Sequence, residues 1–293
     1  MQKSMKIRFL LTGRCTARCK YCHNEGQSKP APMLSLQTIN YMLAELEAHN
    51  LRPQEIILSG GEPTLHKELA AVAKRCKETG AYLSMNSHGG HPERLLAALP
   101  YLDELKLHVD SFHPRIQMES MGIPLDKVRE SIALSQQHHV RILANHPVQD
   151  WASARHFIRA ARIAGIDCKL IDLLGQPSQG GGVDRMPWRQ EGYIRVDQQS
   201  WLHVDGEHRM YTRQCGAEFN AGDGSLFVGT DGIRRSLEGP VIGYPENFSV
   251  ARLMPDIEKT GQPLNHQSCR PNFIVRKWFP KQQYLPTVIH ASF

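Results

Sequence analysis

Short apolar segments alternate with amphipathic ones through the first 173 residues, and this alternation leaves few folds open to the chain. Six strand candidates cover residues 6–12, 55–58, 82–85, 104–109, 140–145 and 167–173. The first amphipathic segment follows Ser35, the expected N-cap, and its apolar residues recur at helical spacing: Ile39, Met42, Leu43 and Leu46. Six strands with five helical crossovers predict an α/β fold with a parallel sheet. Such a sheet either winds doubly or curls into a barrel, and both place ligands at the carboxyl ends of the strands.

The sequence changes in character after residue 173. A stretch rich in Gly, Pro and polar residues reads as a long loop, and two hairpin signals follow it, at Asp205–Gly206 and Asp231–Gly232. We therefore expect two regions: residues 1–175, which hold the parallel sheet, and residues 176–293, a small α+β or mostly β appendage. We expect the appendage to cover the open end of the sheet.

Composition narrows the function classes. Hydrophobic residues make up 41% and charged residues 22%, as in ordinary globular proteins, and no apolar run has the length of a membrane span. We read no signal peptide and expect a cytoplasmic protein without a membrane partner. The net charge of +6 favours an anionic small molecule such as a phosphate ester. A nucleic acid partner is disfavoured, because no basic run carries interleaved aromatic residues.

Three of the seven cysteines, Cys15, Cys19 and Cys22, form a C-x₃-C-x₂-C cluster directly after the first strand candidate. A structural zinc site requires four ligands, and the next cysteine, Cys76, lies on the apolar face of an expected helix. His23 is a poor fourth ligand because it adjoins Cys22. An iron–sulfur cluster also normally takes four cysteines. With three, one iron keeps an open coordination position for another molecule.

The spacing C-x₃-C-x-aromatic-C, with Tyr21 as the aromatic residue, resembles the radical S-adenosylmethionine (SAM) superfamily. Three further segments strengthen the resemblance. "ILSGGEPTL" at 57–65 is similar to the GGEP segment of that family, and "LSMNS" at 83–87 to a TTNG-type strand end. "LKLHVDSFHP" at 105–114 resembles a stretch of the molybdenum-cofactor GTP cyclases and their relatives. Each segment falls at the carboxyl end of an expected strand.

The resemblance implies a partial (β/α)₆ TIM-like barrel that carries one [4Fe–4S] cluster and binds SAM. It assigns the iron ligands to Cys15, Cys19 and Cys22. It assigns the SAM contacts as follows: the methionine end to Gly60, Gly61 and Glu62; the carboxylate or ribose to Ser84, Asn86 and His108; and the adenine side to Tyr21 and Leu143. His108 departs from the family, which has a serine at this position. The electron donor implied is a flavodoxin or a ferredoxin.

The last third of the chain holds a possible second set of cluster ligands. The segment that begins at Cys215 resembles the auxiliary-cluster modules of the family, known as twitch and SPASM, in a degenerate form. Ser236 and Leu237 stand where the second cysteine of such a module belongs. Cys168 and Cys269 are the other candidates. Because an auxiliary cluster also requires four ligands, we expect one cluster per chain.

Three functions are open on the sequence alone. The first is a radical SAM enzyme that abstracts hydrogen from a small molecule, including a phosphorylated one, in cofactor or natural-product biosynthesis. Arg234, Arg235 and Arg270 are candidates to meet an anionic group. The second is a radical SAM maturase of a ribosomal peptide, which the remnant at Cys215 suggests. The third is a zinc-stabilised binding protein without radical chemistry, which leaves the GGEP segment unexplained.

Overall fold

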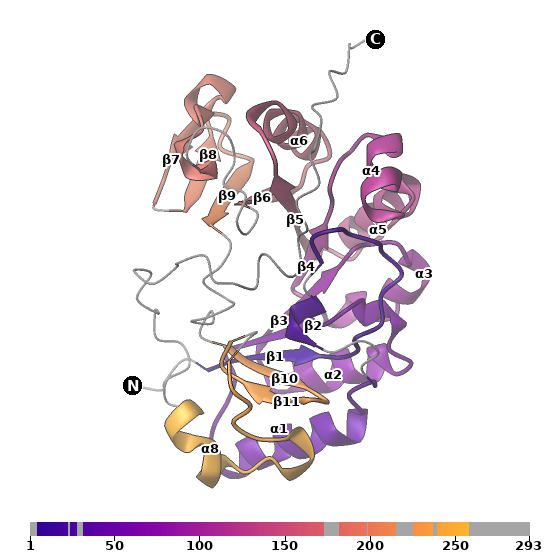
Figure 1. Ribbon diagram of the computed structural model, residues 1–293, viewed down its shortest axis with the longest axis vertical. Coiled ribbons are helices and arrows are strands. Elements are labelled where there is room, and N and C mark those ends of the chain that lie inside the picture. The colour runs from indigo at the N-terminus through magenta and orange to yellow at the C-terminus, as the bar shows by residue number, and fades with distance from the viewer. Residues whose placement is uncertain are drawn as a thin grey trace.

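The computed structural model describes residues 5–22, 24–27, 32–172, 182–197, 199–214, 225–236 and 239–257. Its centre is a curved parallel sheet, and helices lie along the outside of the curve (Figure 1). The six predicted strands are all present: β1 Lys6–Leu10, β2 Glu55–Ser59, β3 Tyr82–Ser87, β4 Glu104–His108, β5 Arg141–Val148 and β6 Asp167–Asp172.

The strand order decides between the two predicted architectures. Strands β1 to β6 are neighbours in chain order, and each pairs in parallel with the next. A doubly wound sheet reverses its strand order at one point, whereas a sheet that keeps one direction curls toward a barrel. The sheet has two edges, at β11 (Gly232–Arg234) and β7 (Tyr193–Arg195), so the barrel is partial, as expected.

Helices fill the crossovers between the strands. The α-helices are α1 Leu36–Ala48, α2 Leu69–Glu78, α3 Pro92–Leu95, α4 Pro114–Met121, α5 Leu125–Gln137, α6 Trp151–Ile163 and α8 Val250–Ile257. Short 3₁₀ turns are η1 Asn24–Gly26, η2 Pro63–Leu65, η3 Leu99–Tyr101, η4 Val183–Arg185, η5 Trp188–Glu191 and η6 Pro245–Asn247. Helix α1 begins as predicted, because the Thr38 backbone N–H donates to the Ser35 hydroxyl at 3.1 Å.

The strands that follow β6 extend the same sheet at both edges. β7 Tyr193–Arg195, β8 Ser200–His203 and β9 Arg209–Gln214 lie beside β6, while β10 Ser225–Gly229 and β11 Gly232–Arg234 lie beside β1. Both predicted hairpins are present, as the antiparallel pairs β8–β9 and β10–β11. The boundary at 175/176 and the covering role of the second region stay predictions.

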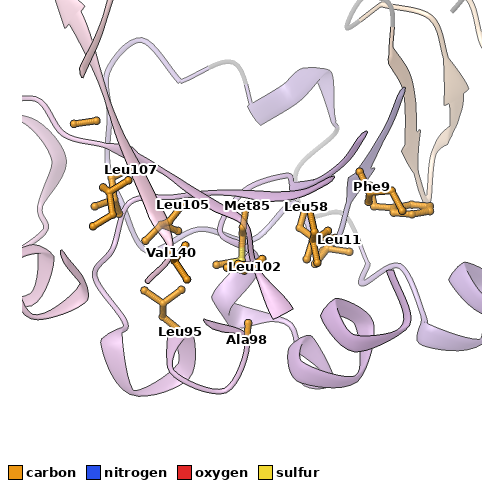
Figure 2. Close-up of a cluster of buried hydrophobic side chains, with 14 of the residues drawn as sticks. Phe9, Leu11, Leu58, Met85, Leu95, Ala98, Leu102, Leu105, Leu107 and Val140 are labelled. Carbon is orange, nitrogen blue, oxygen red and sulfur yellow. The ribbon is translucent and has the colours of Figure 1, made fainter. Parts of the chain in front are cut away.

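Each strand of the barrel has one largely apolar face and one largely polar face, because successive side chains point to opposite sides of the sheet. The side chains toward the helices form the core, in which Phe9, Leu58, Met85, Leu105 and Leu107 lie side by side (Figure 2). The opposite face, here called the inner face, carries polar residues. One row of neighbouring residues on this face runs across four strands, through His108, Asn145, Lys169 and Tyr211.

No helix in the described part of the chain combines the length and the apolar character needed to cross a membrane.

Candidate cofactor site

The loop after β1, here called the cysteine loop, covers residues 11–22. Two backbone hydrogen bonds hold it over the carboxyl ends of the strands: Leu11 N–H to the Ser59 carbonyl at 2.9 Å, and Arg18 N–H to the Met121 carbonyl at 2.8 Å. Cys15, Cys19 and Cys22 are half-buried free thiols on this loop. The structure therefore brings the three predicted ligands to the edge where a parallel sheet binds ligands.

The three thiols lie close enough to influence one another electrically. Burial raises the pKa of the Cys19 thiol to about 12, and the negative charges of Asp110, Cys22 and Cys15 add to the effect. Thiolates gathered in this way need a cationic centre to offset their repulsion. Among the described residues no three His, Cys, Asp or Glu side chains converge on a single metal ion. The donor set itself, three free thiols on one loop, fits a [4Fe–4S] group, in which each thiolate binds a different iron.

Gly60 and Gly61 pack directly against the backbone of the cysteine loop. Gly61 N–H donates to the Thr12 carbonyl at 2.6 Å, and Glu62 N–H donates to the Arg14 carbonyl at 2.8 Å. A Cβ on Gly60 would lie 2.5 Å from the Thr12 carbonyl oxygen, and one on Gly61 would lie 2.2 Å from that of Arg14. Residues with a side chain would therefore push the two loops apart. The predicted role of both glycines in holding SAM stays a prediction.

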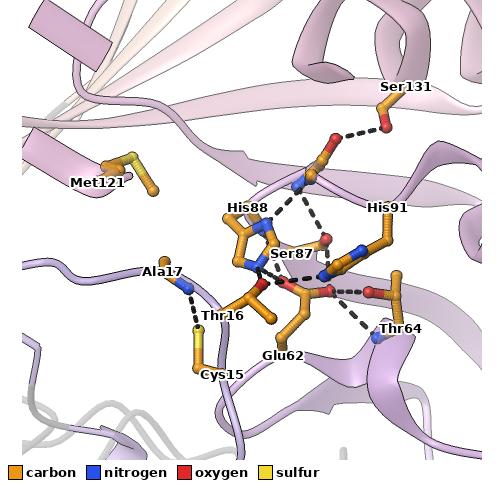
Figure 3. A network of polar contacts seen from close by, with 12 residues as sticks. Cys15, Thr16, Ala17, Glu62, Thr64, Ser87, His88, His91, Met121 and Ser131 are labelled. Atoms are coloured by element: carbon orange, nitrogen blue, oxygen red, sulfur yellow. Dashed lines mark hydrogen bonds and ion pairs between the residues drawn. The ribbon is translucent and has the colours of Figure 1, made fainter. Parts of the chain in front are cut away.

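The carboxylate of Glu62 is fully buried and surrounded by donors (Figure 3). Its Oε1 accepts from the Thr64 hydroxyl at 2.7 Å, the Ser87 hydroxyl at 2.8 Å and the Thr64 N–H at 3.1 Å. Its Oε2 accepts from the His88 N–H at 3.0 Å. In this structure Glu62 thus ties the GGEP segment to the end of β3. Its predicted contact with the SAM amine stays a prediction.

A chain of hydrogen bonds joins Glu62 to the cysteine loop through His88 (Figure 3). His88 Nδ1 accepts from Gly90 N–H at 2.9 Å, so Nε2 carries the proton of the neutral ring. That Nε2 lies 3.2 Å from Glu62 Oε2 and 3.1 Å from the Thr16 hydroxyl. The hydroxyl in turn lies 2.9 Å from His91 Nε2. Burial lowers the pKa of His88, although the charge of Glu62 partly opposes this, so the ring is neutral.

Sequence reasoning missed this chain of contacts. Thr16 lies between two of the cysteines, and the two histidines flank a Gly-Gly pair after β3, in "SHGGH". Polar residues on both loops were the available signal, but only the fold places them together. Thr16 thus holds the cysteine loop to the end of β3.

Tyr21 and His108 meet above β4. The Tyr21 hydroxyl lies 2.7 Å from His108 Nε2 and also donates to Asp110. Burial alone would raise the pKa of Asp110, but its hydrogen bond to His108 and the attraction between the two groups lower it below its usual value. Asp110 is therefore an anion that orients both ring systems. The predicted contacts of Tyr21 and His108 with SAM stay predictions.

The other three predicted SAM contacts lie on the inner face. Asn86 donates to the Ser59 hydroxyl at 2.9 Å, and its side-chain oxygen is buried with no partner among the described residues. Ser84 lies two residues before Asn86 on the same face of β3, and its hydroxyl accepts from Lys106 Nζ at 3.0 Å. Leu143 is 6% exposed and pairs in register with Lys106. Asn86 thus has an open acceptor position, whereas Ser84 is already engaged.

Ion pairs fill the amino-terminal end of the inner face, and the sequence analysis did not foresee them. Lys106 contacts Glu104 at 3.3 Å and Glu55 at 3.4 Å. Arg141 contacts Asp167 at 2.9 Å and Glu104 at 3.2 Å. These pairs lie at the end of the barrel away from the cysteine loop.

Comparison with known proteins decides the family. Residues 9–171, more than half of the chain, match the model of the radical SAM superfamily. The chain belongs to the radical SAM superfamily. The chemistry of this family uses a [4Fe–4S] cluster and SAM, and these are therefore its cofactors. The family also excludes the third function considered above, a zinc-stabilised protein without radical chemistry.

Two curated relatives and one solved structure illustrate the likeness. The "Probable GTP 3',8-cyclase" of Sulfolobus acidocaldarius is 30% identical over 222 residues, which cover 72% of this chain and 69% of the relative. That of Thermococcus kodakarensis is 31% identical over 130 residues, which cover 43% of this chain and only 42% of the relative. The structure of anSMEcpe with bound AdoMet and Cp18Cys peptide is 12% identical, with a TM-score of 0.59 over 87% of this chain and 81% of that one. This last likeness shows the fold alone.

Replacing Glu62 by glutamine is expected to lower the stability of the apo-protein. The new amide would direct N–H groups at donors that now bond to the carboxylate, and an unsatisfied buried group costs about 1–3 kcal/mol. Urea unfolding measures the difference. Glu68→Gln is the matched control, because Glu68 is exposed. Equal unfolding midpoints for the two variants would contradict the anchoring role of Glu62.

Proposed function

We propose that the chain holds one [4Fe–4S] cluster on Cys15, Cys19 and Cys22 and acts on an anionic small molecule in cofactor or natural-product biosynthesis. The observation that carries the proposal is a loop with three free thiols above the polar inner face of a partial barrel. When it is bound and reduced, the cluster with SAM supplies a 5′-deoxyadenosyl radical, which can remove a hydrogen atom from a substrate.

The residues around the cysteine loop divide the SAM contacts between them. The backbone of Gly60, Gly61 and Glu62 adjoins the loop and would hold the methionine end. The open acceptor oxygen of Asn86 would accept from a ribose hydroxyl, and the ring of His108 would meet the carboxylate or the ribose. Tyr21 would lie on the adenine side, with Leu143 across the inner face. The hydroxyl of Ser84, engaged by Lys106, would have to exchange that partner to reach SAM.

The substrate would occupy the inner face over β5, β6 and β9. Lys169 on β6 and Arg213 on β9 lie on this face, in two successive rows, and both are half-buried. Asn145, in the same row as Lys169, has a buried side-chain oxygen with no partner among the described residues. The two cations suit a phosphate group, and the open acceptor suits an O–H or N–H group elsewhere on the same molecule. The name of the Sulfolobus relative supports a nucleoside triphosphate as the first compound to test.

Binding of GTP to the SAM-loaded protein tests this proposal. The double variant Lys169→Gln/Arg213→Gln should bind GTP at least about tenfold more weakly in calorimetry, because charge-assisted hydrogen bonds contribute about 1.5–3 kcal/mol each. Arg209→Gln is the control, since Arg209 lies on β9 as well but is exposed. When deuterated GTP is the substrate, we expect its deuterium to appear in 5′-deoxyadenosine. Equal affinity of guanosine and GTP would argue against an anionic substrate.

A peptide substrate is the second candidate, and the iron content separates the two. Maturases of this kind usually carry auxiliary clusters. Of the candidate ligands for one, Cys168 is fully buried on the helix side of β6, while Cys215 and Cys269 lie outside the described residues. We expect roughly four irons per chain. Roughly eight, with the excess lost in a Cys215→Ala variant, would favour the peptide.

A further inference from the structure

The solvent side of the cysteine loop carries three cations. Exposure alternates along residues 14–20: the even positions are exposed and the odd positions are half-buried. The exposed side chains include Arg14, Arg18 and Lys20, while Cys15 and Cys19 point the other way. The loop contains no Asp or Glu from residue 11 to residue 22. One strip of backbone thus presents thiols inward and positive charge outward.

The cations are close to the thiols and exposed at the surface. Each lies one or two residues from a cysteine, and a residue spans at most about 3.6 Å of extended chain. Arg14 and Arg18 make no ion pair with any residue that the structure describes. Arg18 lies against the end of α4, since a Cβ on Gly122 would come within 2.7 Å of its Nε. This contact positions one guanidinium on the rim of the loop.

A cluster at this loop needs an electron for each SAM that it cleaves, and the charged residues that face solvent on this loop are these cations. We propose that Arg14, Arg18 and Lys20 form the docking surface for an acidic, low-potential one-electron carrier protein. In the transfer the reduced carrier loses one electron and the cluster gains it, and no covalent bond forms or breaks. Opposite charges across such a contact steer the encounter and raise its rate. This inference rests on the proposed function of the three cysteines.

A nucleic acid is the less favoured occupant. Proteins that bind nucleic acids commonly neutralise about 6–10 phosphates, and three cations on one loop fall short of that. A purely local role, in which the cations tune the reduction potential of the cluster, is the remaining alternative. It differs from docking in one respect: it would affect small reductants as strongly as a protein donor.

The test compares two electron sources for the same reaction, which is formation of 5′-deoxyadenosine from SAM. The protein donor is a photoreduced flavodoxin, and the small donor is reduced methyl viologen. In the double variant Arg14→Glu/Arg18→Glu, the apparent second-order rate with flavodoxin should fall about 10- to 100-fold at low salt. The rate with methyl viologen should stay within about twofold of wild type. Raising the salt concentration should slow the wild type with flavodoxin but should not slow the variant, because salt weakens attraction in the first and repulsion in the second.

Two further variants keep the test decisive. Arg52→Glu/Lys74→Glu reverses two exposed charges at the amino end of β2 and on α2, away from the cysteine loop, and should behave as wild type with both donors. Arg14→Gln/Arg18→Gln removes charge without adding acid, and should give a smaller loss with flavodoxin alone. If the glutamate double variant fails to retain iron, this neutral variant carries the comparison.

Other results would overturn the proposal. An equal loss with both donors, together with a shifted cluster potential, would assign the cations to the cluster itself. An unchanged rate with flavodoxin would exclude docking at this loop. Salt-sensitive binding of an RNA oligonucleotide that these substitutions abolish, without any effect on the flavodoxin rate, would assign the surface to nucleic acid. A wild-type protein that forms no 5′-deoxyadenosine with either donor would instead refute the proposed function.

Discussion

Replacing Cys19 by alanine is expected to remove the cluster and all cleavage of SAM while the protein stays folded. Cys19 lies in a loop, and the backbone contact from Cys22 N–H to its carbonyl does not involve the thiol. Two thiolates cannot hold a cluster that needs at least three. Iron content should fall from roughly four per chain to near zero, and 5′-deoxyadenosine should be undetectable with any reductant.

The control for this prediction is the same substitution at a cysteine in the core. Cys76 is fully buried on the side of α2 that faces the hydrophobic core, away from the cysteine loop. Cys76→Ala should cost roughly 1 kcal/mol of stability, as small core truncations do, and keep its iron. Cys19→Ala should show the reverse: loss of iron with an apo-protein unfolding midpoint close to that of wild type. A Cys19→Ala protein that still forms 5′-deoxyadenosine would refute the ligand assignment.

Gly61→Ala is expected to be the second most damaging single change. The added methyl would lie 2.2 Å from the Arg14 carbonyl oxygen, a contact that only a displacement of the cysteine loop or of the GGEP segment can relieve. Overpacking of this kind costs about 1–3 kcal/mol. A displacement of about 1 Å at a reacting site can lower its rate about 100-fold. We therefore expect slower SAM cleavage and weaker retention of iron, measured together with urea unfolding.

Gly80→Ala separates loss of stability from damage to the site. Gly80 follows α2 with φ +80°, so alanine there is strained, but nothing lies within 4 Å of the added methyl. It should lower stability and leave the cluster and SAM cleavage intact. If Gly61→Ala behaves in the same way, the close approach of the two loops does not position the cysteines.

The sequence predicted the elements of the barrel well because their signals are local. The helix face of Ile39, Met42 and Leu46 is buried against the sheet, as the spacing indicated. The six strands begin within one residue of their predicted starts, since each alternates between a helix side and an inner side. The turns at Asp205–Gly206 and Asp231–Gly232 also form hairpins, because such dipeptides adopt the backbone angles that tight turns need.

These local signals could not predict which strands lie next to one another in the sheet. Strand β10 pairs with β1 through Ser225 and Lys6, which are 219 residues apart in the sequence, and β9 pairs with β6. The sequence of a single strand does not specify which strand pairs with it, because pairing and register depend on contacts with residues that are distant in sequence. The expectation of an appendage therefore did not foresee that these strands would extend the sheet at both edges.

The candidate site was predicted as a set of motifs but not as a network. Spacing identified the three cysteines, and a resemblance identified the GGEP segment. The partners of Thr16 and Glu62 were not foreseen, because His88 and Ser87 reach them only through the fold. The two glycines were expected to admit a ligand. In the structure the cysteine loop itself lies beside them, and its backbone is too close for either glycine to carry a side chain.

Electron–nuclear double resonance on the reduced protein tests the central claim most directly. SAM labelled with ¹⁵N in its methionine amine is added to anaerobically reconstituted protein that carries roughly four irons per chain. We expect a ¹⁵N coupling to the cluster, lost in Cys19→Ala and retained in Cys76→Ala. A cluster that shows no such coupling, or a protein that takes up no iron, would contradict it.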